Sequence, residues 1–173
     1  MPTKRTADPE PPQPGLGEAS RAYQAAVDDF DRELARYLGI NETDLRCMEI
    51  LLEELPEASP SQLAERLNLT TGSTTALLDR LEKAGHLARQ AHPTDRRRTV
   101  VRATPDFQRT AYSLMGPLVD EGRQMIAKTF TPEQVATITD FLRRATDLQR
   151  RHVEQLRAKP RSRDGGKPAS EVH

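Results

Sequence analysis

Apolar residues recur at helical spacing along most of the chain, between two terminal stretches that lack such a pattern. In the first periodic stretch, residues 22–38, the spaced residues are Val27, Phe30, Leu34 and Leu38, and Gly39 is placed to end the helix. In the second, one stripe is formed by Leu45, Met48, Leu51, Leu52 and Leu55. Asn41 or Thr43 can cap this second helix, and Pro56 stops it.

Two short helices joined by a tight turn are predicted between residues 59 and 85. Ser59 or Ser61 caps the first helix, and Thr70 or Thr71 caps the second, which runs from about 71 to 84. Asn68 lies between them and tolerates the positive φ that a tight turn needs. The inward-facing apolar positions of the two helices are Leu63, Ala64, Leu67, Leu77, Leu78 and Leu81. Gly85 then provides a helix stop.

A β-hairpin is predicted directly after this helix pair. Residues 86–89 and 99–102 are short and partly alternate between apolar and polar positions. Pro93, Thr94 and Asp95 lie between the two segments, followed by three consecutive arginines, Arg96, Arg97 and Arg98. The hairpin tip is therefore strongly basic.

Two long helices are predicted after the hairpin, which makes the fold class mainly α with one two-stranded sheet. The first runs from about 105 to 129, with Pro117 expected to kink it, and the second begins at Thr131 with Pro132 in the first helical position. Residues 1–18, which contain five prolines, and residues 159–173 are predicted to be disordered tails.

Charge is segregated along a chain whose formal net charge is zero. Of its 173 residues 30% are charged and 4% are aromatic. Between residues 89 and 102, Asp95 stands against Arg89, Arg96, Arg97, Arg98 and Arg102, whereas residues 42–57 are dominated by acids. One surface of a neutral protein can therefore be basic enough to attract a polyanion.

Several classes of protein are excluded by what the sequence lacks. A single cysteine, Cys47, excludes an intrachain disulfide, and no apolar run approaches the ~20 residues that cross a bilayer. The N-terminus lacks the apolar segment of a secretory signal, so we predict a cytoplasmic protein with no membrane contact. The four histidines lack ligand spacing, and no catalytic set or phosphate loop is present. We predict no enzyme, no metal and no cofactor.

A helix-turn-helix followed by a basic hairpin is typical of proteins that grip duplex DNA. The start of the second helix, formed by Thr71, Gly72, Ser73, Thr74 and Thr75, is small and rich in hydroxyls, which suit phosphates and base edges, and Arg80 lies further along it. The tip arginines suit phosphates and a narrow minor groove. Strand alternation turns one arginine inward, and we expect Arg97 to pair with Asp95 and brace the hairpin. The alternatives are a helix cap with an exposed polar face, and a solvated charge run.

Residues 40–115 resemble the MarR family of winged helix-turn-helix regulators. The resemblance lies in DLRCMEIL, LAERL, TTGSTTALLDRLEKAGHLAR and HPTDRRRTVVRAT. Thr75 matches a hydroxyl of the family's recognition helix, Asp95 and Arg97 match its wing pair, and Arg96 and Arg98 match positions that contact DNA. Ala76 departs from the Arg or Lys that many members carry.

The resemblance implies a MarR-like domain over residues 19–158, with a winged helix-turn-helix at about 41–104 and dimerisation helices at about 19–38 and 105–158. It implies an obligate homodimer whose recognition helices enter successive major grooves of an inverted-repeat operator. It also implies a small-molecule or oxidant site, for which Tyr23, Phe30, Tyr37 and Cys47 are candidates. The alternatives are that the aromatic residues form dimer core and that Cys47 is an inert buried thiol.

We therefore predict a dimeric, sequence-specific DNA-binding transcriptional regulator, a repressor relieved by a small-molecule effector. The alternative function is a winged-helix module that binds proteins, with its wing against an acidic partner. The two differ in salt dependence, because affinity that comes from neutralised phosphates falls steeply with salt.

Overall fold

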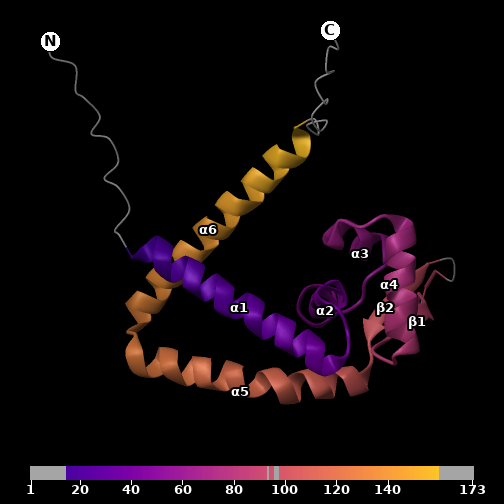
Figure 1. Ribbon diagram of the computed structural model, residues 1–173, viewed down its shortest axis with the longest axis horizontal. Helices are drawn as coiled ribbons and strands as arrows, with labels where there is room; N and C mark the ends of the chain where they lie inside the picture. The colour runs from indigo at the N-terminus through magenta and orange to yellow at the C-terminus, as the bar shows by residue number, and fades with distance from the viewer. Residues whose placement is uncertain (1–14, 93, 96–97, 160–173) are drawn as a thin grey trace, which may run out of the picture. The chain divides into compact units, whose positions relative to one another are not determined.

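The structure is a computed structural model that describes residues 15–92, 94–95 and 98–159. Along the chain its elements are α1 (Leu16–Leu38), α2 (Glu42–Glu49), the π-helical η1 (Ile50–Glu54), α3 (Pro60–Leu67), α4 (Thr71–Lys83), β1 (Leu87–Ala91), β2 (Thr99–Ala103), α5 (Pro105–Thr129) and α6 (Pro132–Ala158) (Figure 1). The predicted mainly helical fold with one two-stranded sheet is confirmed. The chain forms two compact units, divided between Leu114 and Met115, and each is described by itself below.

Short polar side chains set where the helices begin. The Asn41 side chain accepts a hydrogen bond from the backbone N–H of Asp44 at 2.8 Å, and Thr70 accepts one from Ser73 at 3.2 Å. Ser59 and Gln62 form a reciprocal capping box at the start of α3. In each pair of alternatives that the sequence offered, the first residue is the cap. Orphan N–H groups of the first turn are thereby satisfied.

Helix α1 begins earlier than the sequence predicted. Its first residue is Leu16, so residues 16–18, expected to belong to the N-terminal tail, are helical. Gly15 and Lys159, also predicted to belong to the tails, flank α1 and α6 as their caps, and residues 1–14 and 160–173 of the predicted tails lie outside the described residues. At the other end Gly39 adopts a left-handed conformation with φ 68° and ends the helix as predicted.

The second predicted helix continues into a wider π-helical turn instead of keeping one geometry to Pro56. The N–H of Leu55 donates to the carbonyl oxygen of Ile50 at 2.8 Å, a five-residue step. Both Ile50 and its neighbour Leu51 are buried. Ile50, which the predicted stripe did not include, thereby joins the core beside Leu51.

The two strands form an antiparallel hairpin that is tied to the helices at its base. Leu87 pairs with Ala103 and Ala91 with Thr99. Ala58, in the segment before α3, forms a bridge to Val101 through two backbone hydrogen bonds of 2.7 and 3.1 Å. The hairpin is thus anchored next to the start of α3.

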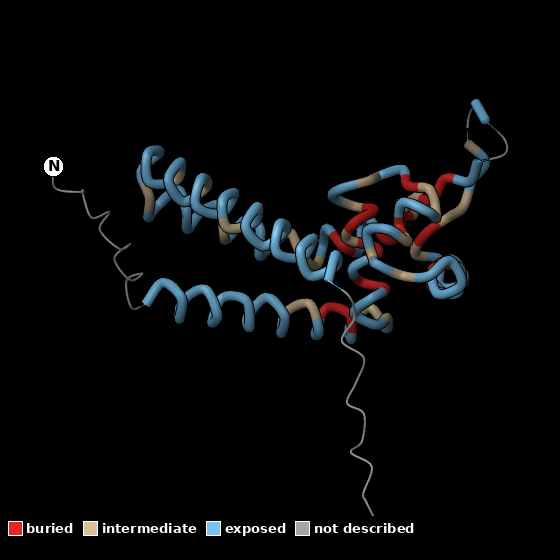
Figure 2. The backbone as a smooth tube through the Cα atoms, turned by 90° about the horizontal axis from the view of Figure 1, so that it is seen from above, coloured by how far each residue is buried: buried red, intermediate tan, exposed pale blue. Residues whose placement is uncertain are grey.

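The buried core lies in the unit that ends at Leu114. Figure 2 shows buried residues gathered between the end of α1 and the start of α5, while α6 is exposed or half-buried throughout. The core contains Cys47, Met48, Ile50, Leu51, Ala58, Leu63, Leu77, Leu78, Leu81, Leu87, Val101, Ala103, Phe107 and Ala111. Apart from Ala58, these residues come from α2, η1, α3, α4, both strands and α5, so the helix-turn-helix and the base of the hairpin share one packed core.

The second unit contains the rest of α5 and all of α6. Helix α5 contains Pro117 and runs on to Thr129, and α6 starts with a capping box between Thr131 and Gln134. None of the residues of α6 is buried. Among the described helices, none is both long enough and apolar enough to cross a membrane.

Candidate nucleic-acid interface

Helices α3 and α4 form a helix-turn-helix whose turn is fixed by backbone conformation. Asn68 ends α3 in the left-handed region with φ 54°, as its sequence position predicted. The N–H of Leu69 donates to the carbonyl oxygen of Ala64 at 2.9 Å, and Thr70 then caps α4. Three residues therefore turn the chain from one helix into the next.

One face of α4 points away from the core and carries small side chains. Thr71, Gly72, Thr75 and Ala76 are exposed. A Cβ atom placed on Gly72 would meet no protein atom within 4 Å, so neither packing nor backbone conformation requires a glycine here. The small residues leave the backbone of α4 open to close approach from outside.

Thr74 differs from its neighbours because it faces inward. Its side chain is 2% exposed, and its hydroxyl donates to the carbonyl oxygen of Thr70 at 2.9 Å. Sequence analysis placed Thr74 among the DNA-binding residues. Its hydroxyl is buried and used within the helix, so we assign Thr74 to packing and leave it out of the interface. Ser73 is exposed, with its hydroxyl 2.9 Å from that of Thr70.

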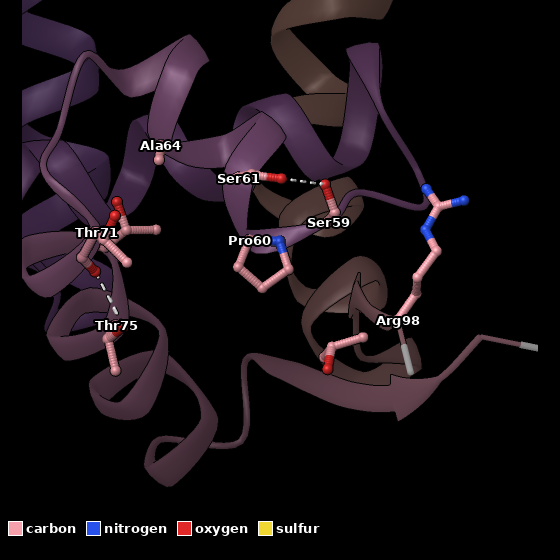
Figure 3. A pocket seen from close by; sticks show the side chains of 9 residues that line it. Ser59, Pro60, Ser61, Ala64, Thr71, Thr75 and Arg98 are labelled. Atoms are coloured by element: carbon pink, nitrogen blue, oxygen red, sulfur yellow. Dashed lines mark hydrogen bonds between the residues drawn. The ribbon is translucent and has the colours of Figure 1, made fainter. Parts of the chain in front are cut away.

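The first turn of α4 and the wing line the same hollow. This hollow has a volume of about 420 Å³ and is lined by Ser59, Pro60, Ser61, Ala64, Thr71, Thr74, Thr75, Arg98 and Thr99. Figure 3 shows Thr71 and Thr75 on one side, the Arg98 side chain on the other and Pro60 between them. A guanidinium and a hydroxyl-rich helix start thus share one surface, as the sequence-based interpretation required. Sequence analysis missed the contribution of Ser59, Pro60 and Ser61 to it, although their capping signature marks them as a helix start.

The tip of the wing is described only in part. Arg96 and Arg97, two predicted DNA contacts, and Pro93 lie outside the described residues, so the expected pairing of Arg97 with Asp95 stays a prediction. The N–H of Arg98 donates to the carbonyl oxygen of Asp95 at 2.9 Å, and the N–H of His92 donates to that of Arg98 at 2.8 Å. These two bonds close the loop just beyond the strands.

Fewer of the arginines between residues 89 and 102 are free of acidic partners than the sequence suggested. Arg89 forms ion pairs with Asp79 at 2.6 Å and Glu82 at 2.7 Å, both on α4. Arg102 pairs with Glu57 at 2.5 Å. Counting charge along the chain missed these acids because the fold brings them in from other segments. Arg98, by contrast, is exposed and lines the hollow beside α4.

Arg89 also connects the wing to the recognition helix, a role that sequence analysis did not assign. Besides its two carboxylate partners, it donates to the backbone carbonyl oxygen of Thr75 at 3.4 Å. Its partners on α4 are seven, ten and fourteen residues away. The side chain thus braces β1 against the exposed face of α4.

Arg80, predicted to contact DNA, is committed to a buried carboxylate. Its Nε donates to Oδ2 of Asp44 at 2.8 Å, and its Nη2 donates to Oδ1 at 2.6 Å. The Asp44 side chain is 1% exposed, whereas that of Arg80 is 51% exposed. The ion pair raises the pKa of Arg80, although burial of the guanidinium opposes it. This geometry gives Arg80 a structural role, that of joining α4 to α2, instead of the predicted contact.

The four residues predicted to line a ligand pocket differ in how far they are buried. Tyr23 and Tyr37 are 69% and 70% exposed, Phe30 is half-buried, and Cys47 is fully buried in the core. None of them lines the hollow beside α4.

A second hollow, of about 350 Å³, lies between α1 and α2 and is lined by Asp28, Asp31, Arg32, Glu42, Leu45, Arg46 and Glu49. Burial raises the pKa of Asp31 and of Glu49. Within the described ranges, no group of three or more His, Cys, Asp and Glu side chains is arranged to hold a metal ion.

Cys47 should be unreactive in the folded protein. Burial, reinforced by the Asp44 carboxylate, raises the pKa of its thiol from an ordinary value near 9 to about 12. At pH 8 we expect the native thiol to react with a disulfide reagent at least about a hundredfold more slowly than the urea-unfolded chain, because the thiolate is the reactive form. Since the folded state holds the proton more tightly, this group should reduce stability as the pH rises from about 9 to about 12. Rapid labelling of the native protein would restore Cys47 as a candidate sensor.

Comparison with known proteins agrees with this geometry. The model of the MarR family matches residues 40–99. The uncharacterised HTH-type transcriptional regulator YcgE of Bacillus subtilis (strain 168) is 36% identical over 128 residues, which cover 74% of this chain and 82% of YcgE. Among solved structures, the transcriptional regulator PA4135 is 27% identical with a TM-score of 0.51, over 86% of this chain and 100% of that one. A MarR family protein from Bacillus stearothermophilus has a TM-score of 0.60 at 21% identity, over 78% and 92% of the two chains, and shares the fold.

Proposed function

Because this chain belongs to the MarR family of transcriptional regulators, which bind DNA, we propose that it is a cytoplasmic repressor that binds an inverted-repeat operator as a homodimer and is released by a small molecule. One observation gives the strongest support for this mode of DNA binding. The exposed start of α4 and the Arg98 guanidinium line the same hollow. A helix start and a basic wing on one surface suit the major groove and the phosphates beside it.

In this proposal each half of the interface has a distinct role. Thr71, Gly72, Ser73 and Thr75 enter the major groove, where small residues let the helix backbone approach the bases. Arg98, together with Arg96 and Arg97, contacts phosphates and the neighbouring minor groove. Arg89 holds the wing at a fixed distance from α4, so the two parts engage DNA together.

Exposed apolar side chains support the homodimer. In the second unit they are Leu118, Val119, Met125, Ile126, Ile138, Phe141, Leu142, Leu148, Val153 and Leu156. In α6 they recur at intervals of one to six residues over a helix of 27 residues in which nothing is buried. A helix with such a stripe gains stability when a partner covers it, and a second copy of the chain supplies a matching stripe. In the first unit, Tyr23, Val27 and Tyr37 of α1 are exposed as well.

Release by a small molecule would act through the spacing of the two recognition helices. Two half-sites on one face of DNA are about 34 Å apart, so the dimer must match this repeat. A ligand that binds better to a mismatched form lowers operator affinity by its differential affinity for the two forms. Tyr23, Phe30 and Tyr37 on α1 are the residues that we propose for contact with such a ligand, because α1 offers accessible aromatic surface.

Selection of bound duplexes from a random pool, followed by a salt titration, tests the proposal. We expect an inverted repeat, two chains per duplex, and a log–log salt slope of about −0.9 for each phosphate contact. The family's ability to bind DNA would not extend to this chain if no duplex were enriched. A flat salt response together with capture by an acidic protein would favour the protein-interaction module instead.

A further inference from the structure

The Thr75 hydroxyl lies on the exposed face of α4 and donates its proton to a hydrogen bond within the helix. Its Oγ1 donates to the backbone carbonyl oxygen of Thr71 at 2.9 Å, the contact drawn as a dashed line in Figure 3. A carbonyl oxygen can only accept, so the hydroxyl must supply the proton of this bond. What remains on Oγ1 for an outside partner is a pair of acceptor sites.

The exposed positions that follow Thr75 in the next turn of α4 carry no uncommitted donor side chain. Ala76 offers a methyl group, and Asp79, one turn further along, has an acceptor-only carboxylate. Arg89 pairs with Asp79, which offsets the charge that would otherwise repel a polyanion. Arg80 reaches back to Asp44. Between Thr75 and Arg80 the exposed face of α4 therefore offers acceptors and apolar surface, and the next side-chain donor on this face is the exposed Lys83 at the end of the helix.

From this arrangement, and resting on the proposed function, we infer that Thr75 reads sequence by accepting a hydrogen bond from an exocyclic amino group, N4 of cytosine or N6 of adenine, in the major groove. These are the two amino groups that base pairs present there. Phosphate oxygens and the O6 and N7 atoms of guanine accept only, so each would meet an oxygen lone pair instead of a proton. Thr75 thus selects bases and is not a backbone contact.

Base analogues that lack a single amino group test whether Thr75 accepts a hydrogen bond from a base. In the operator selected from the random pool, each adenine would be replaced by purine and each cytosine by 2-pyrimidinone, one symmetric pair of positions at a time. Affinity would be measured for the wild type and for Thr75→Val, which keeps the shape of the side chain but lacks the oxygen. Thr110→Val is the matched control, since Thr110 makes the same type of bond to the carbonyl oxygen of Asp106 at 3.0 Å on α5.

We expect one position at which removal of the amino group weakens wild-type binding about fivefold per half-site and leaves Thr75→Val unaffected. The Thr110→Val protein should respond like the wild type. Two results would overturn the inference while the proposed function stands. One is specific binding in which no amino deletion depends on Thr75. The other is an equal loss for Thr75→Val on operator and random DNA. Failure to bind any duplex would remove the proposed function, and the inference with it.

Discussion

Replacing Arg96 and Arg98 by alanine should weaken DNA binding by about a hundredfold to a thousandfold at 0.15 M salt and make the binding less sensitive to salt. In a dimer the double substitution removes four guanidinium groups from the wings. If each neutralises one phosphate, the log–log salt slope should become shallower by about 3 to 4. Because phosphates are the same in every sequence, the loss should be similar on operator and on random DNA.

The structural basis of this expectation is that two other arginines of the hairpin, Arg89 and Arg102, are already paired. Arg89 is bound to two carboxylates of α4, and Arg102 to Glu57. Arg98 is exposed and lines the hollow beside the start of α4. Arg96 lies outside the described residues, and its inclusion follows from the sequence pattern.

A charge-matched variant separates phosphate contact from a general loss of positive charge. Arg36→Ala with Arg109→Ala removes the same number of charges from α1 and α5, where both arginines form exposed ion pairs with carboxylates three residues away. This control should change affinity little, because neither arginine belongs to α4 or to the hairpin, the parts proposed to contact DNA. If the wing variant had the same affinity and the same salt slope as this control, the wing would not belong to the interface.

Much of the fold could be predicted because the signals are local. The caps Asn41, Ser59 and Thr70 each accept a hydrogen bond from a backbone N–H only three residues later. Asn68 likewise sets the turn through its own left-handed backbone conformation. The hairpin followed from two alternating segments around a turn. Sequence spacing alone therefore gave the helix-turn-helix and the wing, which are the parts of the site that depend on order along the chain.

The side-chain chemistry of the site could not be predicted in the same way, because it depends on partners far away in sequence. Arg80 and Asp44 are 36 residues apart, and Arg102 and Glu57 are 45 apart. Nothing in the local pattern distinguishes an arginine that faces DNA from one that neutralises a buried acid. Likewise, Thr74 and Thr75 are adjacent and identical in type, and only the phase of α4 against the core buries one and exposes the other.

Replacing Arg80 by methionine should lower the free energy of unfolding by about 2 to 3 kcal/mol. Methionine retains the apolar length of the side chain, so the main change is that the Asp44 carboxylate, 1% exposed, loses both of its hydrogen bonds to the guanidinium. Breaking a fully buried pair costs about 3 to 5 kcal/mol, and we expect less because Arg80 is half exposed and water can reach the carboxylate after it is removed. Urea denaturation at neutral pH and a fixed protein concentration measures the difference.

Two further variants show whether the loss of stability in Arg80→Met comes from the unpaired Asp44 carboxylate. Asp44→Leu combined with Arg80→Met removes both charges and should recover most of the loss, because the penalty comes from a buried charge without a partner. Arg36→Met breaks an exposed ion pair with Glu33 and should stay within about 0.5 kcal/mol of the wild type. If Arg80→Met were as stable as Arg36→Met and yet bound DNA less tightly, the guanidinium would leave Asp44 to reach DNA. The ion pair would then be a resting position of a DNA contact, and the structural role assigned to Arg80 would be wrong.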